Sequence, residues 1–130
     1  MPRLQHVSIP RPPGEDSADQ ARSFYTDIIG LESKPVPSTI QHLDLVWFII
    51  ENDIELHVIA EEPRDTTTRR HFCLVMEDDL KILRKKIEEA DYETWSPEEI
   101  RGRPRFFCRD PFDNIIEFTR IEANYIDFED

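Results

Sequence analysis

The sequence has few of the features that mark secreted, membrane-bound or disulfide-rich proteins. Its two cysteines, Cys73 and Cys108, are too few for a disulfide framework, so we expect reduced thiols. No apolar run approaches the ~20 residues that a membrane-spanning helix needs. The N-terminal stretch MPRLQHVSIP also lacks the apolar core of a secretion signal. We therefore expect a cytoplasmic protein without a membrane partner.

Basic side chains are scarce relative to acidic ones. The chain has 16 Lys and Arg against 28 Asp and Glu, which gives a formal net charge of −12. Nucleic acids and anionic membranes are bound through clustered Lys and Arg, so we expect neither as a partner. Cations, metals and neutral small molecules stay open, although solubility alone is the simplest explanation of the charge.

The composition is that of a folded domain. The chain has 130 residues, of which 38% are hydrophobic and 34% charged. A chain of this length buries roughly two thirds of the surface that its unfolded form exposes. We therefore expect one domain with a core large enough to carry a pocket.

The first half, residues 1–61, is predicted to have the order β-α-β-β-β. A capping box at Ser17 and Gln20 starts the helix, and Gly30 is expected to end it. The apolar face of this helix recurs at i, i+3, i+4 and i+7, in Ala21, Phe24, Tyr25 and Ile28. Short β-branched and aromatic runs predict the strands, at 3–9, 31–37, 43–51 and 54–61.

The second half, residues 70–130, repeats this order after a polar linker at about 62–69. Asp78 or Asp79 caps its helix. The apolar face of that helix is formed by Leu80, Leu83, Ile87 and Ala90. Strands are expected at 71–76, 92–95, 105–109 and 115–120.

The two halves also agree in their polar residues. His6 lies in the first strand of one half and Glu55 in its last, 49 positions later; His71 and Glu117 take the same places in the other half, 46 positions apart. A carboxylate in the apolar run IIEFT is costly to bury unless it is paired or bound to a metal. Packing of the halves about a pseudo-twofold axis would bring these four side chains together.

Several segments together resemble the vicinal oxygen chelate superfamily, which includes glyoxalase I, fosfomycin-resistance proteins, extradiol dioxygenases and bleomycin-resistance proteins. The resemblance covers nearly the whole chain, and it is carried by LQHVSI, ARSFYTDIIGLE, IELHV, RHFCLVMEDDL and RFFCRDPFDNIIEF. It implies an α+β fold in which two βαβββ modules form a curved, cup-shaped mixed β-sheet with flanking helices. The chain departs from the family at Asp113, where members usually carry Gly; Asp tolerates left-handed backbone geometry, so the turn is expected to survive.

The resemblance also implies a metal site. Its ligands, carried over to this sequence, are His6, Glu55, His71 and Glu117, and the ion is one divalent metal of the kind that imidazole and carboxylate bind: Zn, Ni, Co, Fe or Mn. The subset without Glu55 is similar to the three-ligand sites of fosfomycin-resistance enzymes and dioxygenases. His57 shares a strand face with Glu55, so it stays open as a neighbouring donor or an alternative ligand.

Other residues are candidates for the pocket around such a site. The aromatic candidates are Trp47, Phe48, Trp95, Phe106 and Phe107, and Arg103 and Arg105 are candidates to meet a substrate carboxylate. Cys73 shares a face with His71, but a small thiol in a strand is usually core packing, so we do not assign it as a nucleophile or ligand. His42 has no counterpart in the other half and is expected at the surface.

Three functions are compatible with this sequence. The first is a metal-dependent glyoxalase-like enzyme that isomerises or lyses a small substrate chelated through adjacent oxygens, with Glu117 or Glu55 as base. The second is an Fe(II) extradiol-type dioxygenase that uses His6, His71 and Glu117. The third is a bleomycin-resistance-like binding protein without catalysis, for which the acidic charge would suit a cationic ligand. The family also implies a homodimer.

Overall fold

The structure is a computed structural model that describes residues 1–62 and 65–129. The chain divides into two compact units, Met1–Thr67 (unit 1) and Thr68–Asp130 (unit 2). The boundary falls inside the predicted linker, of which residues 63–64 lie outside the described residues.

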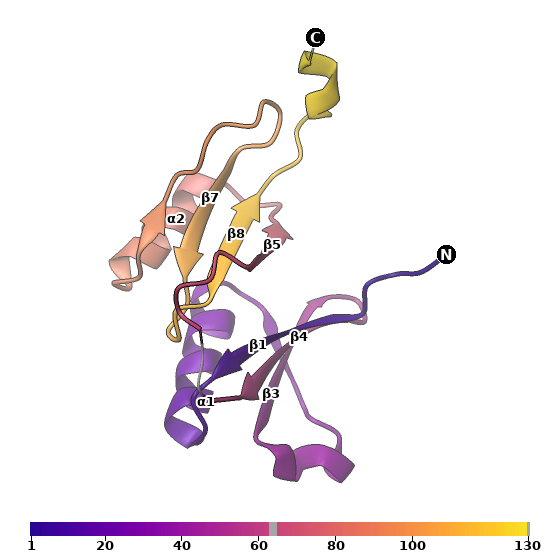
Figure 1. The fold of residues 1–130 in the computed structure, drawn as a ribbon, viewed down its shortest axis with the longest axis vertical. Helices are drawn as coiled ribbons and strands as arrows, with labels where there is room; N and C mark the ends of the chain where they lie inside the picture. The colour runs from indigo at the N-terminus through magenta and orange to yellow at the C-terminus, as the bar shows by residue number, and fades with distance from the viewer. Residues whose placement is uncertain (63–64, 130) are drawn as a thin grey trace. The chain divides into compact units, whose positions relative to one another are not determined.

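Unit 1 contains a four-stranded mixed sheet with the strand order β1-β4-β3-β2 (Figure 1). Its strands are β1 (His6–Arg11), β2 (Glu32–Lys34), β3 (Leu45–Glu51) and β4 (Ile54–Ala60). β1 runs parallel to β4, whereas the β4–β3 and β3–β2 pairs are antiparallel. A parallel neighbour requires a crossover connection, and the helix that follows β1 provides part of it.

That helix covers one face of the sheet. α1 (Glu15–Arg22) continues as the π-helix η1 (Ser23–Ile28), and the ring of Tyr25 packs 5.4 Å from that of Phe48 on β3. Gly30, at φ 95°, follows the end of the helix as predicted. The predicted capping box is wrong, because the helix begins after Gly14 and Ser17 is buried within its first turns.

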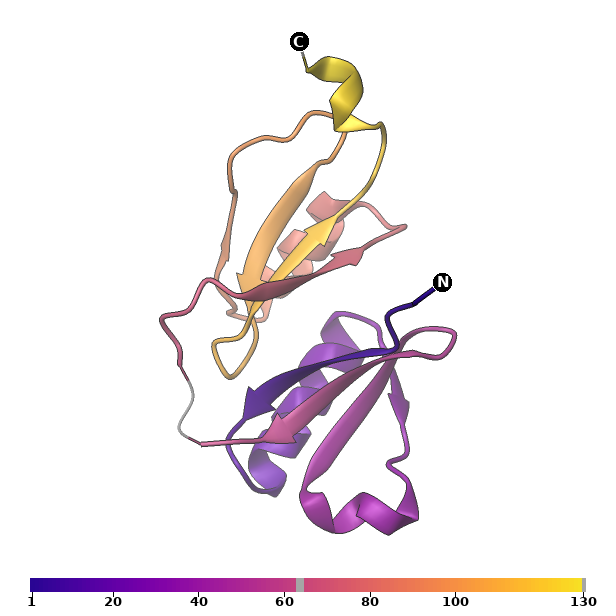
Figure 2. The same cartoon turned by 45° about the vertical axis from the view of Figure 1, so that its right-hand side comes forward.

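Unit 2 repeats this topology with the order β5-β8-β7-β6 (Figure 2). Its strands are β5 (His71–Val75), β6 (Thr94–Trp95), β7 (Arg105–Arg109) and β8 (Ile115–Thr119). β5 and β8 are parallel and the other pairs antiparallel. α2 (Leu80–Glu89) is capped by Asp79, whose side chain accepts from the Lys81 N–H. The predicted α+β fold with two βαβββ repeats is confirmed.

Alternation along the strands builds a core on the helix-facing side of each sheet. These buried side chains are fully or almost fully inaccessible: Phe48, Leu56 and Val58 in unit 1, and Phe106, Ile116 and Phe118 in unit 2. The residues between them point to the opposite face, which we call the open face. Glu117 therefore lies on the open face with Ile115 and Thr119, while Ile116 and Phe118 pack behind, as the strand pattern predicts.

A buried arginine ties the connections of unit 1 together. Arg11 is fully buried, and it donates to Asp44 Oδ1 at 2.6 Å and to Ser17 Oγ at 2.7 Å. Asp44 lies between the 3-10 helix η2 (Ser38–Leu43) and β3, and it also accepts from the Gly14 N–H. The end of β1, the start of α1 and the start of β3 are thereby fixed to one another. A second 3-10 helix, η3 (Tyr125–Phe128), follows β8.

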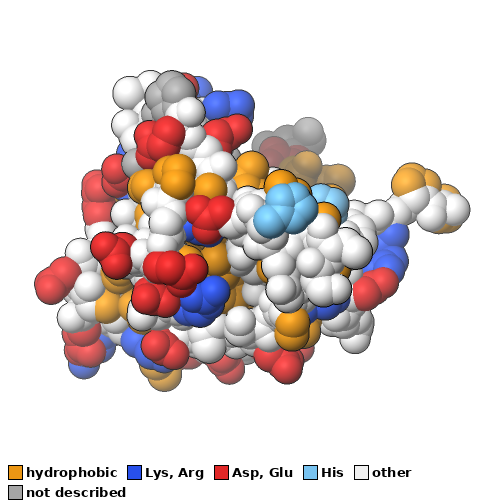
Figure 3. All heavy atoms as spheres, turned by 90° about the horizontal axis from the view of Figure 1, so that it is seen from below, with side chains coloured by type: hydrophobic (Ala, Val, Ile, Leu, Met, Phe, Trp, Pro, Cys, Tyr) orange, Lys and Arg blue, Asp and Glu red, His pale blue; other side chains and the backbone are white. Residues whose placement is uncertain are grey.

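The surface agrees with the acidic composition. Acidic side chains dominate the charged surface in the view of Figure 3, with fewer basic ones among them. Among residues 1–62 and 65–129, no helix is long and apolar enough to cross a membrane.

Candidate functional site

The open face of unit 1 carries polar side chains in strand register. β1 and β4 pair so that His6 lies beside Glu55, and β4 and β3 pair so that His57 lies beside Trp47. Lys34 on β2 is the next residue in the row after Trp47. Glu55 and His57 are nevertheless only 5% and 8% exposed. Five polar or aromatic groups thus meet on the one face that the helix leaves uncovered.

His57 lies between two aromatic rings. Its imidazole is parallel to the indole of Trp47, with centroids 3.9 Å apart, and the imidazole of His6 stacks against it at 4.2 Å. Burial is the largest cause that lowers the pKa of His57, because desolvation disfavours the charged imidazolium. The ring is held in one orientation and favours the neutral form, which is the form that binds metals.

Both oxygens of Glu55 have donors. The Lys34 ammonium donates to Oε2, and His57 Nε2 lies 2.9 Å from Oε1. The hydrogen bond from Lys34 is the largest cause that lowers the pKa of Glu55 to about 2. Glu55 is therefore an ionised carboxylate at neutral pH whose orientation is fixed by Lys34 and His57.

The tautomer of His6 follows from its neighbour Gln5. The amide nitrogen of Gln5 donates to the Asp53 carbonyl at 2.7 Å, so its oxygen faces His6 Nδ1, also at 2.7 Å. An amide oxygen only accepts, so Nδ1 carries the proton and the Nε2 lone pair is available to a ligand.

The open face of unit 2 brings His71 and Arg105 onto Glu117. Glu117 is 8% exposed; its Oε1 lies 3.1 Å from His71 Nε2, and its Oε2 lies 3.4 Å from an Arg105 guanidinium nitrogen. Phe107 lies beside Glu117 in the register and meets the edge of the His71 ring at 4.9 Å. The apolar strand IIEFT therefore carries a buried carboxylate that is paired. Pairing of this kind is what makes the burial of a carboxylate tolerable.

The two ring nitrogens of His71 have different partners. Nδ1 lies 3.0 Å from the Arg69 carbonyl and can only donate to it, as His6 Nδ1 donates to Gln5. In a neutral ring, the Nε2 lone pair then points at the Glu117 carboxylate, so a proton or another cation must lie between the two atoms. An imidazole nitrogen and a carboxylate oxygen that converge are typical ligands of divalent transition metals. The pair therefore fits the ion that the sequence predicts.

Each unit supplies a pair of candidate ligands. Within residues 1–62 and 65–129, no group of three or more His, Cys, Asp or Glu side chains is arranged so that it could hold a metal ion. The four predicted ligands are divided equally, with His6 and Glu55 in unit 1 and His71 and Glu117 in unit 2.

The other predicted site residues divide between the two faces. Trp47, His57 and Arg105 lie on the open faces with the candidate ligands. Phe106 does not: it is 2% exposed, stacks on Phe118 at 5.2 Å, and has the Arg84 guanidinium of α2 over its ring. The pocket role expected for Phe106 does not fit this placement, and Phe107, one residue later, faces Glu117 instead.

Cys73 is exposed and pairs with Glu117 in the strand register. The expectation that it packs in the core is therefore wrong. Its assignment as a non-nucleophile has a different physical basis: desolvation first, and then the Glu117 carboxylate, raise the pKa of the thiol to about 11. The thiolate is the reactive form, so Cys73 is a weak nucleophile at neutral pH. His42 is exposed in η2, as expected.

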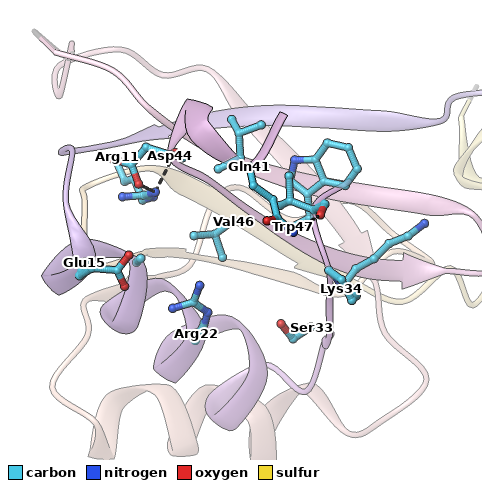
Figure 4. A pocket seen from close by; sticks show the side chains of 13 residues that line it. Arg11, Glu15, Arg22, Ser33, Lys34, Gln41, Asp44, Val46 and Trp47 are labelled. Atoms are coloured by element: carbon cyan, nitrogen blue, oxygen red, sulfur yellow. Dashed lines mark hydrogen bonds and ion pairs between the residues drawn. The ribbon is translucent and has the colours of Figure 1, made fainter. Parts of the chain in front are cut away.

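A cleft of about 430 Å³ lies between α1 and residues within the segment 33–47 of unit 1 (Figure 4). Its cations already have carboxylate partners, because Arg11 pairs with Asp44 and Lys34 with Glu55. Arg22 pairs with Asp19 in the same way. The cleft thus has little free positive charge with which to bind an anion.

Sequence reasoning missed three groups that shape the site: Lys34, Gln5 and the carbonyl of Arg69. The strand alternation of Glu32–Lys34 places Lys34 on the open face, but its pairing with Glu55 depends on the register of three strands. Gln5 precedes His6 directly in the sequence, and this adjacency is a local indication of the contact between the two side chains.

Comparisons with known proteins support the fold. No family model matches the chain, and no curated protein matches it. A solved glyoxalase family protein from Bacillus anthracis is 25% identical, and the match covers 93% of this chain and 96% of that one with a TM-score of 0.82.

More distant structures share the same architecture. The fosfomycin resistance protein FosX from Listeria monocytogenes is 10% identical over 92% of this chain and 93% of its own, with a TM-score of 0.73. TnmS3, an antibiotic binding protein from Streptomyces sp. CB03234, is 17% identical over 93% of this chain and 97% of its own, with a TM-score of 0.69. The resemblance to the vicinal oxygen chelate superfamily is confirmed at the level of the fold.

Proposed function

We propose that this chain is a metal-dependent, glyoxalase-like enzyme that acts on a small substrate with two adjacent oxygens. One observation carries the proposal: in each unit, the first-strand histidine donates Nδ1–H to a carbonyl oxygen, at 2.7 Å for His6 and 3.0 Å for His71. Metal-binding histidines typically donate their other ring N–H to an oxygen in this way, because the bond fixes the tautomer that offers Nε2. The same arrangement occurs in both repeats.

The proposed ligands are His6, His71 and Glu117, together with one residue of β4. The bound divalent ion would supply Lewis-acid polarisation of the substrate oxygens. Zn, Ni, Co, Fe and Mn all suit this set of nitrogen and oxygen donors.

Glu117 is the proposed proton acceptor. Its Oε2 lies at the long distance of 3.4 Å from an Arg105 guanidinium nitrogen, whereas Lys34 and His57 hold both oxygens of Glu55. Arg105 orients the Glu117 carboxylate, and Phe107 forms an apolar wall beside it. A carboxylate held in this way can act as a general base that takes a proton from carbon next to a carbonyl.

The metal content of protein purified without a chelator or affinity tag tests this proposal. We expect about one divalent ion per chain, and we expect His71→Ala to lose it, because the substitution removes a ligand. His42→Ala is the matched control, since His42 is an exposed histidine of unit 1, and it should retain the ion. Failure of the wild-type protein to take up Zn, Ni, Co, Fe or Mn would contradict the proposal of a metal-dependent enzyme.

The second candidate is a non-catalytic small-molecule binding protein. It is favoured by the structural likeness to an antibiotic binding protein and by the formal net charge of −12, which would attract a cationic ligand. Such a binder has no need of matched metal ligands. A metal-free protein that binds cationic drug-like compounds would support this candidate.

A further inference from the structure

We infer that unit 2 contains a further binding site, which holds the carboxylate of a small organic acid between Arg101 and Arg103. Both arginines line a pocket of about 530 Å³, a size typical of small-molecule sites. The pocket is formed by residues 99–103, which precede β7, and by residues 125–129, which include η3. These two segments lie at the same end of unit 2 (Figures 1 and 2). The site lies within one unit and requires no metal, so it goes beyond the proposed enzyme.

The chain that follows β8 is fixed to the other wall of the pocket at Gly102. The Gly102 carbonyl accepts from the N–H groups of Glu122 and Ala123, at 2.8 and 3.1 Å. Gly102 has a φ of 79°, a left-handed conformation that glycine adopts without strain. A Cβ at this position would lie 2.9 Å from the Ala123 Cβ. The two walls are therefore held together by backbone contacts, without the help of a ligand.

Each of the two arginines lies over an aromatic ring of η3. The Arg101 Cζ is 4.5 Å from the centre of the Phe128 ring, and the Arg103 Cζ is 5.3 Å from the centre of the Tyr125 ring. A ring face attracts the charge of a guanidinium, but it provides no oxygen acceptor for the five N–H donors of that group. The rings thus orient the two cations and leave hydrogen-bond donors available.

The lack of a carboxylate partner distinguishes these two arginines. Three other described arginines of unit 2 lie over rings, and each has such a partner: Arg84 pairs with Glu88, Arg105 with Glu117, and Arg109 with Glu93. Within residues 1–62 and 65–129, neither Arg101 nor Arg103 pairs with a carboxylate, although acidic residues outnumber basic ones in the chain. The Nε of Arg103 is also buried, and it has no acceptor among the same residues. An acceptor from outside the chain would satisfy both groups.

The acceptor that fits this pocket best is a carboxylate. A guanidinium binds carboxylates and phosphates through paired N–H bonds, because its planar fork matches their oxygens. Glu99 and Glu129 also line the pocket, and their negative charges disfavour a doubly charged phosphate more than a singly charged carboxylate. Ile100, Tyr125 and Phe128 provide apolar surface. An organic acid with a small apolar or aromatic body therefore matches both parts of the lining.

NMR of the arginine Nε–H groups tests this inference, with phenylacetate as the probe and a chelator in the buffer. We expect phenylacetate to shift the signals of Arg101 and Arg103. The signal of Arg109 should stay unchanged, because this arginine also lies over a ring but is paired with Glu93. Arg101→Lys, Arg103→Lys and Arg109→Lys assign the three signals. Phenylacetamide, which has the same ring but no charge, should shift none of them.

The affinities of the variants complete the test. Arg103→Lys keeps the charge but loses the guanidinium fork, so phenylacetate should bind about 10-fold more weakly. Arg109→Lys is the matched control and should bind phenylacetate as the wild type does. Wild-type affinity in both Arg101→Lys and Arg103→Lys would overturn the site, as would the absence of shifts or equal binding of phenylacetamide.

Two further comparisons define what the result means. Tighter binding of inorganic phosphate than of phenylacetate at the same two signals would overturn the carboxylate as the ligand class. All of these measurements are made without a metal. Their failure would therefore leave the proposed enzyme intact, and loss of the proposed enzyme would leave this site intact.

Discussion

At the scale of single residues, the charged groups of unit 1 are held by specific partners. Arg11 is fully buried, and Asp44 is its one carboxylate partner among the described contacts. The hydrogen bond from Arg11 is the largest cause that lowers the pKa of Asp44, and the Gly14 N–H adds to it. The ionised form of Asp44 is therefore favoured in the folded protein more than in the unfolded chain.

This linkage predicts a pH-dependent effect of Asp44→Asn. The folded pKa is depressed, so the stabilisation by Asp44 is complete above its ordinary pKa of about 4 and is lost as the pH falls through the folded value. We expect Asp44→Asn to lower the free energy of unfolding by about 2 kcal/mol at pH 7, the worth of a hydrogen bond to a charged group. Urea denaturation measures this difference, which should shrink below pH 4.

Asp53→Asn is the control for that experiment. The pKa of Asp53 is also lowered, by its hydrogen bond with Arg3, but both side chains are more than half exposed. Exposed ion pairs contribute little to stability, so the effect should be smaller than that of Asp44→Asn. An Asp44→Asn effect that stays constant from pH 7 to pH 3 would contradict the linkage.

At the scale of elements, each open face depends on a helix that covers the other side of its sheet. In unit 2, α2 packs on β6 and β7, and Ile87 is its fully buried contact residue. Asp79 fixes the start of this helix. The candidate ligands on β5 and β8 are thus positioned by packing that occurs behind them.

Ile87→Ala should therefore destabilise the protein by about 3 kcal/mol, because the deletion leaves a cavity between helix and sheet. Ile82→Ala in the same helix is the matched control: Ile82 is 70% exposed, against 0% for Ile87, and its substitution should change the stability by less than about 0.5 kcal/mol. Thermal or urea unfolding compares the two. Equal effects would show that α2 does not pack as described.

The elements and the candidate ligands differ in how far the sequence predicts them. Periodicity and caps predict the two βαβββ repeats and a helix cap at Asp78 or Asp79, of which Asp79 is the cap in the structure. Local signals suffice there, because side-chain spacing and turn chemistry act over a few residues. The left-handed geometry at Asp113, where φ is 70°, is expected from the family resemblance instead.

The equivalence of ligand positions depends on longer-range structure. The separations from His6 to Glu55 and from His71 to Glu117 are similar, at 49 and 46 positions, but each crosses a helix and several loops whose lengths differ. The separation between two paired residues of one hairpin crosses a single turn, so it is the better measure of register. By this measure, His57, and not Glu55, occupies the position equivalent to Glu117.

At the scale of the whole molecule, the chain is a duplication in which each repeat carries one pair of candidate metal ligands. The pairs lie on the open faces of two sheets with the same strand order. A single pair binds a divalent metal weakly, since structural and catalytic sites usually hold the ion with three or four protein ligands. The proposed enzyme therefore requires more than one of these pairs to bind the same ion.

The stoichiometry of Co²⁺ binding to the wild type, His6→Ala and His71→Ala tests this central claim most directly. We predict about one ion per wild-type chain by calorimetric titration, and loss of high-affinity binding in either variant, because each removes a ligand of the same ion. Binding of two ions per chain, with one retained in each variant, would contradict the claim, as would a wild type that binds none.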